Sequence, residues 1–206
     1  NRRNTMSAVP GLAQERHREK KELVDALLRG TQRPGVEEVI AWLEETDFYT
    51  APASTRKHGA IEGGLLRHSL TVYKYMQNFS KPLEDKLPED SITLVSLLHD
   101  VCKANFYGRS VRNVKIPGER RWEEQESFTI EDQFPLGHGE KSLFLVQRQI
   151  PLTDDEALAI RWHMGGFDDA ARAYASGISL SNAYEKSKLA VALHVADMYT
   201  ANMIGH

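Results

Sequence analysis

The chain has 206 residues, of which 41% are hydrophobic and 27% charged, and its formal net charge is −3. This length suits one domain with a sizeable core, although two very small domains also remain open. The slight excess of acidic residues argues against broad, charge-driven coating of nucleic acid. No apolar run approaches the ~18–20 residues that a membrane-spanning helix needs.

Cysteine usage and the absence of a leader pattern bear on the compartment. Cys102 is the only cysteine, so no intramolecular disulfide can form, as is usual in a reducing cytosol. No basic stretch is followed by the apolar core of a secretory signal. We therefore expect a cytoplasmic protein.

Two helices are predicted before residue 48. Residues 12–29 carry Leu23 and Leu27 on one face among many charges, which indicates an amphipathic helix that ends at Gly30. Pro34 suits the first turn of a second helix. The apolar stripe of that second helix consists of Val36, Val39, Ile40 and Leu43.

The next part of the chain predicts a loop and two further helices. Residues 48–64 are rich in glycine and are expected to be mostly loop, and residues 65–79 follow a helical pattern. Ser91 is a predicted N-cap for a helix over residues 91–105. The first two turns of that helix are apolar nearly all round, so we expect it to lie at the centre of the fold.

The segment after this helix is predicted to be a β-hairpin. Residues 109–116 alternate in polarity, Pro117-Gly118 is a turn signal, and residues 121–130 contain aromatic and β-branched side chains. We therefore predict an all-α fold with a small β-hairpin insertion around 109–130.

Helices are predicted to resume after the hairpin. The pattern indicates helices over 139–150, over 153–163 with Thr153 as the cap, and over 182–203. Residues 165–181 are rich in glycine and alanine, and both a loop and a short helix remain open for them.

Polar residues on apolar helices are the main chemical signal. His99-Asp100 lies in the predicted central helix, and burial of such a pair costs several kcal/mol unless a partner compensates. His68 and Asp197 raise the same problem on two other predicted helices. Imidazole and carboxylate groups from facing helices are a common way to build a metal site. The alternative for each residue is an ordinary hydrogen-bonded position in the core.

These residues, in this order, resemble the H…HD…D signature of the HD superfamily, a group of all-α, metal-dependent phosphohydrolases. The similarity extends from about residue 48 to residue 206, and the Gly63–Leu70 phrase is similar to the HD domain of a class of bacterial 3′–5′ exoribonucleases. It implies an HD-domain helical bundle over 48–206, with residues 1–47 packed on it as helices. The matching phrases are GGLLRHSL (Gly63–Leu70), LLHDVCK (Leu97–Lys103), GHGEKS (Gly137–Ser142), RWHMG (Arg161–Gly165) and LHVADMYTA (Leu193–Ala201).

The resemblance also implies a ligand set. In members with two ions, additional histidines hold the second ion and the central aspartate bridges, so Asp100 is the expected bridge between two divalent transition metals such as Mn, Fe, Ni or Zn. The alternative for His138 is a loop histidine in solvent, and the alternative for His163 is a helix-end histidine bonded to a carbonyl. The expected metal ligands are His68, His99, Asp100, His138, His163 and Asp197.

A catalytic role is expected for two residues. Two cations about 3.5–4 Å apart can activate a water and clamp the oxygens of a phosphoryl group, and Asp100 would orient that water. Lys103 follows Asp100 on the same predicted helix face, where it could neutralise a phosphate oxygen. The alternative for Lys103 is a surface lysine at a helix end.

Substrate contacts are expected from residues around this site. Arg109 and Arg112 lie on the predicted hairpin close to Trp122 in sequence, a combination that can hold a phosphate and stack a base. His194 precedes Asp197 by one helical turn, and His58 lies in a stretch similar to members with a second histidine near the site. The alternatives are a solvated hairpin and ordinary structural histidines.

We therefore expect a metal-dependent phosphohydrolase, a phosphodiesterase or phosphomonoesterase, that acts on a nucleotide or short oligonucleotide through metal-activated water. Long nucleic acid is not expected as a partner, because the chain is acidic and has no room for the OB domain of the exoribonucleases. The alternatives are a non-catalytic metal- or nucleotide-binding module and a structural domain without metal. The N-terminal helices are open to two roles, completion of the bundle or a homodimer face.

Overall fold

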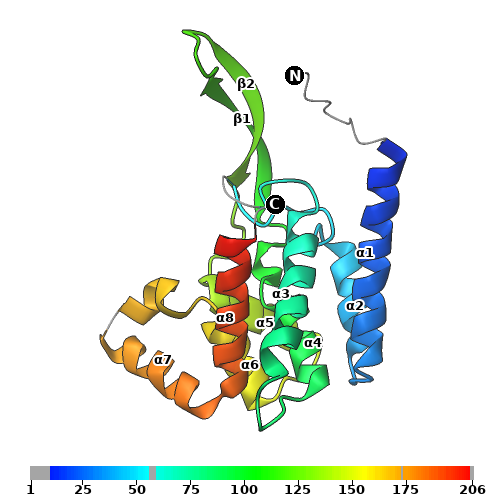
Figure 1. Cartoon of the computed structure of the whole chain (residues 1–206), viewed down its shortest axis with the longest axis vertical. Coiled ribbons are helices and arrows are strands. Elements are labelled where there is room, and N and C mark those ends of the chain that lie inside the picture. The colour runs from blue at the N-terminus through cyan, green and yellow to red at the C-terminus, as the bar shows by residue number, and fades with distance from the viewer. Residues whose placement is uncertain (1–9, 56–58, 173, 205–206) are drawn as a thin grey trace.

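The structure is a computed structural model that describes residues 10–55, 59–172 and 174–204. It is mostly helical and carries one two-stranded antiparallel sheet, which confirms the helical fold with a hairpin (Figure 1). The longer helices are α1 (Pro10–Gly30), α2 (Val36–Glu45), α3 (Gly64–Ser80), α4 (Glu89–Leu98), α5 (His138–Gln147), α6 (Asp154–Trp162), α7 (Tyr174–Lys186) and α8 (Lys188–Met203).

The core lies between α3, α4, α6 and α8. Helix α3 packs against α4 and α8, and α6 packs against α5 and α8. Helices α1 and α2 supply buried side chains to this same core, among them Val24, Leu28 and Val39. Because α1 contacts α3 and α4 directly, the N-terminal helices complete the hydrophobic core.

Two details of the N-terminal helices differ from the prediction. Helix α1 buries Val24 and Leu28, whereas Leu23 is 49% exposed, because the packed stripe lies one residue further along than the predicted one. Helix α2 begins at Val36 and not at Pro34. Pro34 and Gly35 form a turn before the helix, in which Gly35 has a φ of 94°. A β-carbon at Gly35 would lie 2.7 Å from the carbonyl oxygen of Gln149.

The predicted central helix ends earlier than expected. Helix α4 stops at Leu98, and a short 3-10 helix, η1 (Val101–Lys103), follows. Asp100, with φ −107° and ψ 16°, lies outside the helical region and breaks the helix. The His99-Asp100 pair therefore lies at the buried end of α4 and not inside a helix.

Ser91 is not the N-cap of α4. The helix begins earlier, with Pro88 at the cap position, and Ser91 is the third residue of its first turn. The buried Ser91 hydroxyl donates to Glu156 Oε1 at 2.7 Å. Ser91 therefore makes a tertiary contact with α6 and does not cap its own helix.

The hairpin is confirmed and forms an arm that extends beyond the helices (Figure 1). Strand β1 (Tyr107–Lys115) pairs with β2 (Trp122–Ile130). Side chains alternate between the two faces along a strand. Arg109 and Arg112 are three residues apart in β1, so they point to opposite faces of the arm.

The C-terminal helices are confirmed with one correction. Thr153 caps α6 with a full capping box, in which its side chain accepts from the Glu156 N–H. The single helix predicted over 182–203 is two helices, because the chain breaks at Ser187, whose side chain caps α8. The open segment before it forms 3-10 turns η2 (Gly165–Phe167) and η3 (Asp169–Arg172) and much of α7.

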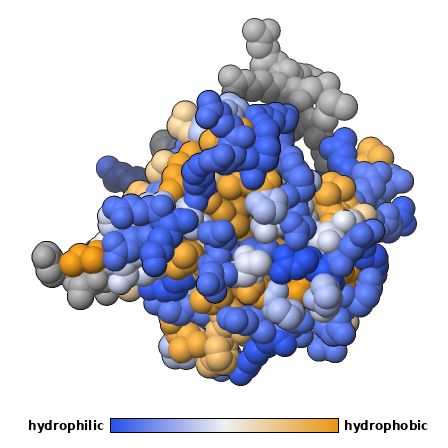
Figure 2. All heavy atoms as spheres, turned by 90° about the horizontal axis from the view of Figure 1, so that it is seen from below, coloured by the Kyte–Doolittle hydropathy of each residue, from blue (hydrophilic) through white to orange (hydrophobic). Residues whose placement is uncertain are grey.

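Hydrophilic side chains cover most of the face seen in Figure 2, with smaller hydrophobic patches between them. In the described ranges, no helix combines the length and the apolarity needed to cross a bilayer.

Candidate metal centre

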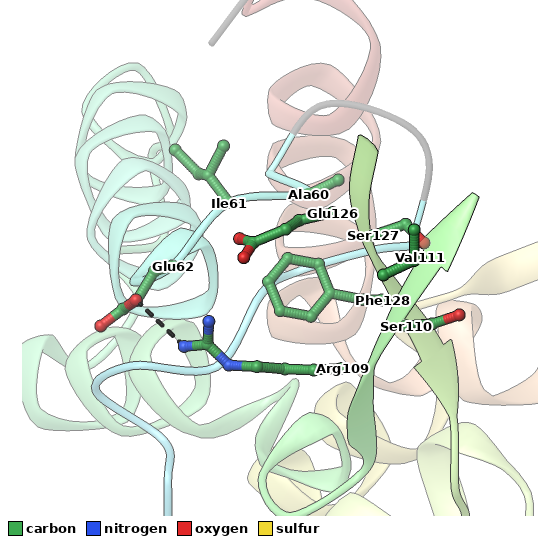
Figure 3. Close-up of a pocket in the computed structure, with 9 residues that line it drawn as sticks. All are labelled: Ala60, Ile61, Glu62, Arg109, Ser110, Val111, Glu126, Ser127 and Phe128. Atoms are coloured by element: carbon green, nitrogen blue, oxygen red, sulfur yellow. Dashed lines mark hydrogen bonds and ion pairs between the residues drawn. The ribbon is translucent and has the colours of Figure 1, made fainter. Parts of the chain in front are cut away.

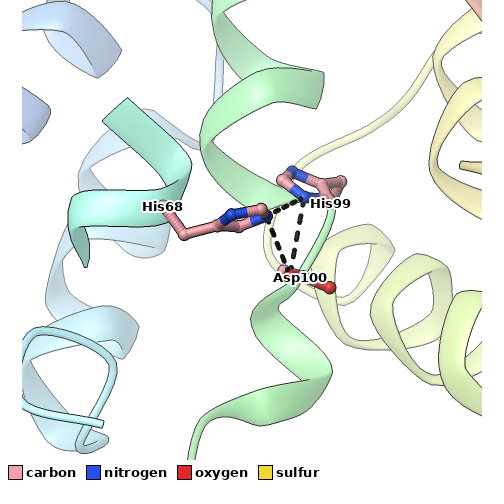
Figure 4. Close-up of side chains that lie close together, drawn as sticks. All are labelled: His68, His99 and Asp100. Carbon is pink, nitrogen blue, oxygen red and sulfur yellow. Dashed lines mark hydrogen bonds and ion pairs between the residues drawn. The ribbon is translucent and has the colours of Figure 1, made fainter. Parts of the chain in front are cut away.

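The six predicted metal ligands meet at one place in the core. His68 comes from α3, and His99 and Asp100 come from the turn after α4. His138 begins α5, His163 lies in the turn directly after α6, and Asp197 comes from α8. Figure 4 shows His68 and His99 approaching each other from two helices, with Asp100 beside them. The donor atoms form three groups, and within each group they lie within 4.8 Å of one another: His68, His99 and Asp100; His99, His163 and Asp197; Asp100, His138 and His163.

The spacing of the first donors suits a transition-metal ion. His68 Nε2 lies 3.3 Å from His99 Nε2, 3.3 Å from Asp100 Oδ2 and 3.0 Å from Asp197 Oδ1. Nitrogen and oxygen ligands stand about 2.0–2.2 Å from such an ion, and two neighbouring ligands are then roughly 3 to 4 Å apart. The observed separations fall in that range.

Asp100 faces different partners with its two carboxylate oxygens. Oδ2 points to His68 and His99, at 3.3 and 3.6 Å, and Oδ1 points to His138 and His163, at 2.7 and 3.5 Å. Because each oxygen faces two imidazole nitrogens, one carboxylate lies between two histidine pairs.

Backbone carbonyls orient two of the histidines. His99 Nδ1 lies 2.9 Å from the carbonyl oxygen of Ser96, and His163 Nδ1 lies 2.7 Å from that of Ile160. A carbonyl can only accept, so Nδ1 carries a proton in each ring, and Nε2 presents a lone pair to the cluster whenever the ring is neutral. Histidine metal ligands are commonly oriented in this way.

One buried acceptor in the cluster is left open. His163 is fully buried, and its Nε2 has no hydrogen-bond partner among the residues that the structure describes. Such a group costs about 1–3 kcal/mol when it is left unsatisfied. A cation at this point would satisfy it, so the donor set and the open acceptor both fit a divalent transition metal.

The charges of the cluster also call for a cation. Burial favours the neutral carboxyl of Asp100, but Lys103 and His99 outweigh it and hold its pKa well below the usual range. His68 and His99 act in the same way on the pKa of Asp197. Burial lowers the pKa of His68, but hydrogen bonds to the two carboxylates raise it to about 9. Without a metal, protons therefore balance the buried negative charge.

Lys103 contacts the cluster directly. Its Nζ lies 2.6 Å from Asp100 Oδ2, and its side chain is 17% exposed. Burial lowers the pKa of Lys103, but the charge of Asp100 raises it above its ordinary value, so the amine stays protonated. The structure therefore places Lys103 at the cluster, in direct contact with Asp100.

His138 marks the accessible side of the cluster. Its side chain is 29% exposed, whereas the Asp100 side chain that it contacts is 2% exposed. Cys102 is buried, and its Sγ lies 3.4 Å from His138 Nδ1. Burial raises the pKa of the Cys102 thiol to about 12, so it packs as a neutral side chain.

His194 does not donate to the cluster itself. Its Nδ1 lies 2.7 Å from the carbonyl oxygen of His163, and its ring stacks on Tyr184 at 5.8 Å between centroids. Gly165, with a φ of 54°, leaves room for that ring, because a β-carbon there would lie 2.5 Å from it. His194 thus holds the backbone of His163, a residue of the cluster.

The other expected substrate contacts lie elsewhere. Arg109 pairs with Glu62 at 3.4 Å at the surface, and Arg112 bonds to Gln125, its cross-strand neighbour, at 3.3 Å. The two arginines point to opposite faces of the arm, so they cannot hold one phosphate together. His58 lies outside the described residues.

Gly139 is a positioning residue that the sequence reasoning missed. A β-carbon on Gly139 would lie 2.0 Å from the carbonyl oxygen of Arg161, so only glycine allows α5 to approach α6 this closely. This approach brings His138 next to His163, with ring centroids 5.1 Å apart. The glycines on both sides of His138 were the available signal.

Comparisons with known proteins give no further guide, because no family model, no curated protein and no solved structure matches this chain.

Proposed function

We propose that the chain is a metal-dependent phosphohydrolase of the HD type that acts on a nucleotide or short oligonucleotide. The observation that carries this proposal is the position of Asp100, whose two oxygens face two histidine pairs. A bridging carboxylate between two sets of ligands is the arrangement that two-metal phosphoryl chemistry uses. The H…HD…H…H…D order of the ligands adds support through the resemblance to the HD superfamily.

Two sets of residues would hold the ions. His68, His99 and Asp197 would bind one ion and His138 and His163 the other, with Asp100 shared. Mn, Fe, Ni and Zn are the metals that imidazole and carboxylate ligands favour. When bound, such ions lower the pKa of a water and polarise a phosphoryl oxygen.

The chain's own residues position the reaction. Asp100 is oriented by Lys103 and His138, at 2.6 and 2.7 Å, and can hold the attacking water in line by accepting its hydrogen bond. Lys103 keeps its proton and is partly exposed, so its ammonium can donate to a non-bridging phosphate oxygen. Substrate would approach on the side of His138, the most exposed of the six ligands.

The test is hydrolysis of bis(p-nitrophenyl) phosphate after chelation and readdition of Mn²⁺, Ni²⁺, Fe²⁺, Mg²⁺ or Zn²⁺. We expect activity to return with at least one transition metal in the wild type and to be lost in Asp100→Ala. The matched control is Asp169→Ala, which removes an aspartate that is 93% exposed. Activity that survives Asp100→Ala would show that the site assignment is wrong.

The alternative function is a non-catalytic module that binds metal or nucleotide. It is favoured if the wild type binds metal but hydrolyses neither phosphodiesters nor phosphomonoesters, including p-nitrophenyl phosphate. Asp100→Ala should then lose metal binding without any change in turnover.

A further inference from the structure

A cavity of about 380 Å³ lies between the hairpin arm and the loop that precedes α3 (Figure 3). This volume falls in the range of about 300–1,000 Å³ that small-molecule pockets have. The cavity has an apolar part and three charged groups. The lining residues that matter here are Ile61, Glu62, Arg109, Val111, Glu126 and Phe128.

One face of the arm builds this pocket. In the strand register Arg109 lies opposite Phe128, and Val111 lies opposite Glu126, so all four side chains share a face. Figure 3 shows the Arg109 guanidinium and the Glu126 carboxylate on either side of the Phe128 ring, toward the loop. A flat aromatic surface is thus flanked by a donor and an acceptor.

The charged groups of the pocket are either unpaired or weakly paired, so a ligand can bind to them. The Glu126 side chain has no hydrogen-bond or ion-pair partner among the described residues. Within the part of the chain that the structure describes, Arg109 pairs with Glu62 alone, at 3.4 Å, and both side chains are largely exposed, at 75% and 65%. Exposed pairs of this kind contribute roughly 0–1 kcal/mol, so a ligand can replace the contact.

We propose that this pocket binds the purine base of the nucleotide that is hydrolysed at the metal centre, an inference that rests on the proposed function. Phe128 would stack on the base, as aromatic side chains do with every nucleobase. Arg109 would donate to the O6 and N7 acceptors of guanine, the commonest arginine–base contact. Glu126 is an acceptor only, so it requires N–H donors on the base.

The need of Glu126 for N–H donors predicts an order of affinity among the bases. Guanine presents a ring N–H and an exocyclic amine side by side, which match the two oxygens of one carboxylate. Adenine presents one exocyclic amine, with an unprotonated ring nitrogen next to it. Uracil presents one ring N–H between two carbonyl oxygens, which a carboxylate repels, and its single ring stacks over a smaller area. Binding should therefore weaken from guanine to adenine to uracil.

The pocket lies close enough to the metal centre to serve the same ligand. Six residue-to-residue steps separate Glu62 from His68, and the last four of these steps lie within α3. Their α-carbons are thus no more than roughly 13 Å apart, from the rise of a helix and the reach of extended chain. A nucleotide or short oligonucleotide can span that distance.

The test is calorimetric binding of GMP, AMP and UMP to the full chain after metal has been removed with chelator. The three ligands carry the same phosphate, so differences in affinity report on the base. We expect the order GMP, AMP, UMP from tightest to weakest. Phe128→Ala should weaken GMP binding by about 5- to 150-fold, the range for loss of a stacking aromatic, and Phe128→Tyr should restore it. Equal binding of the three nucleotides, no binding, or unchanged affinity in Phe128→Ala would overturn the proposal.

A matched pair of variants tests the acceptor. Glu126→Gln should reduce the preference for GMP, whereas Glu123→Gln, on the opposite face of the same strand, should leave it unchanged. Equal effects of the two substitutions would contradict the assignment. Hydrolysis of bis(p-nitrophenyl) phosphate by the metal-loaded wild type separates the two proposals. Hydrolysis without base preference would refute only the pocket, and base preference without hydrolysis would refute only the enzyme.

Discussion

The core holds two buried polar clusters that differ in how completely they are satisfied. Around Glu156, each carboxylate oxygen has partners within the chain: Arg33 and Ser91 bond to Oε1, and Arg33 and the Thr153 N–H bond to Oε2. In the histidine–aspartate cluster, His163 Nε2 has no hydrogen-bond partner in the described part of the chain, and Asp100 Oδ1 lies 3.5 Å from it. The first cluster is closed and ties α4 and α6 to the segment before α2. The second is open, and its open acceptor and buried carboxylates call for a cation from outside.

Loss of a partner in the closed cluster should lower the free energy of unfolding more than loss of an exposed ion pair. In Arg33→Met the fully buried Glu156 carboxylate loses the one cation that pairs with it among the described residues. Breaking a buried pair costs about 3–5 kcal/mol of unfolding free energy. Urea unfolding measures this loss. The control is Arg29→Met, whose exposed pair with Glu37 should cost less than about 1 kcal/mol. Similar small losses in both variants would mean that the Glu156 network contributes little.

The open cluster should gain stability from metal. At a free metal concentration of about 100 times Kd, the free energy of unfolding should rise by about 2.7 kcal/mol. Asp100→Asn should show no such gain, because it loses the carboxylate that both sets of ligands share. Thermal unfolding with and without chelator measures the difference. If metal leaves the stability of the wild type unchanged, the histidine–aspartate cluster does not bind a cation and is satisfied within the chain, like the cluster around Glu156.

Acid should weaken the closed cluster. Burial raises the pKa of Glu156, but Arg33 and its other hydrogen-bond donors outweigh it and lower the pKa below 4.5. A lowered pKa stabilises the fold above the unfolded-state value, and this contribution is lost as the pH falls through the folded-state value. The stability advantage of the wild type over Glu156→Gln should therefore shrink as the pH falls below about 4.5. An advantage that stays constant between pH 7 and pH 3 would contradict the assignment.

The convergence of the candidate site could be predicted from the sequence because its residues lie where polar groups are costly. His68 and Asp197 lie on helices whose packed faces are mainly apolar, and a tertiary contact is the usual way to compensate such a buried polar group. The hairpin was also predictable, since its alternation and its Pro117-Gly118 turn are local signals. The same alternation already places Arg109 and Arg112 on opposite faces, although both were expected to bind substrate.

The remaining features depend on contacts between distant residues. The apolar pattern continues through Leu98 and Val101, so the sequence gives no sign that the helix breaks at Asp100. Ser91 is a good capping residue, but its partner Glu156 lies far along the chain. The buried face of α1 differs by one residue from the expected face, because both patterns fit a helix and only packing distinguishes them.

The central claim is that the open cluster binds divalent metal, and equilibrium dialysis followed by metal analysis tests it most directly. Wild-type chain, stripped with chelator and dialysed against Mn²⁺, Fe²⁺, Ni²⁺ or Zn²⁺, should retain two ions per chain of at least one metal. His138→Ala should retain one, and Asp100→Asn should bind at least about 100-fold more weakly, beyond the 10- to 100-fold cost of losing an outer-shell partner. Retention of metal by Asp100→Asn at the wild-type level, or none by the wild type, would contradict the account.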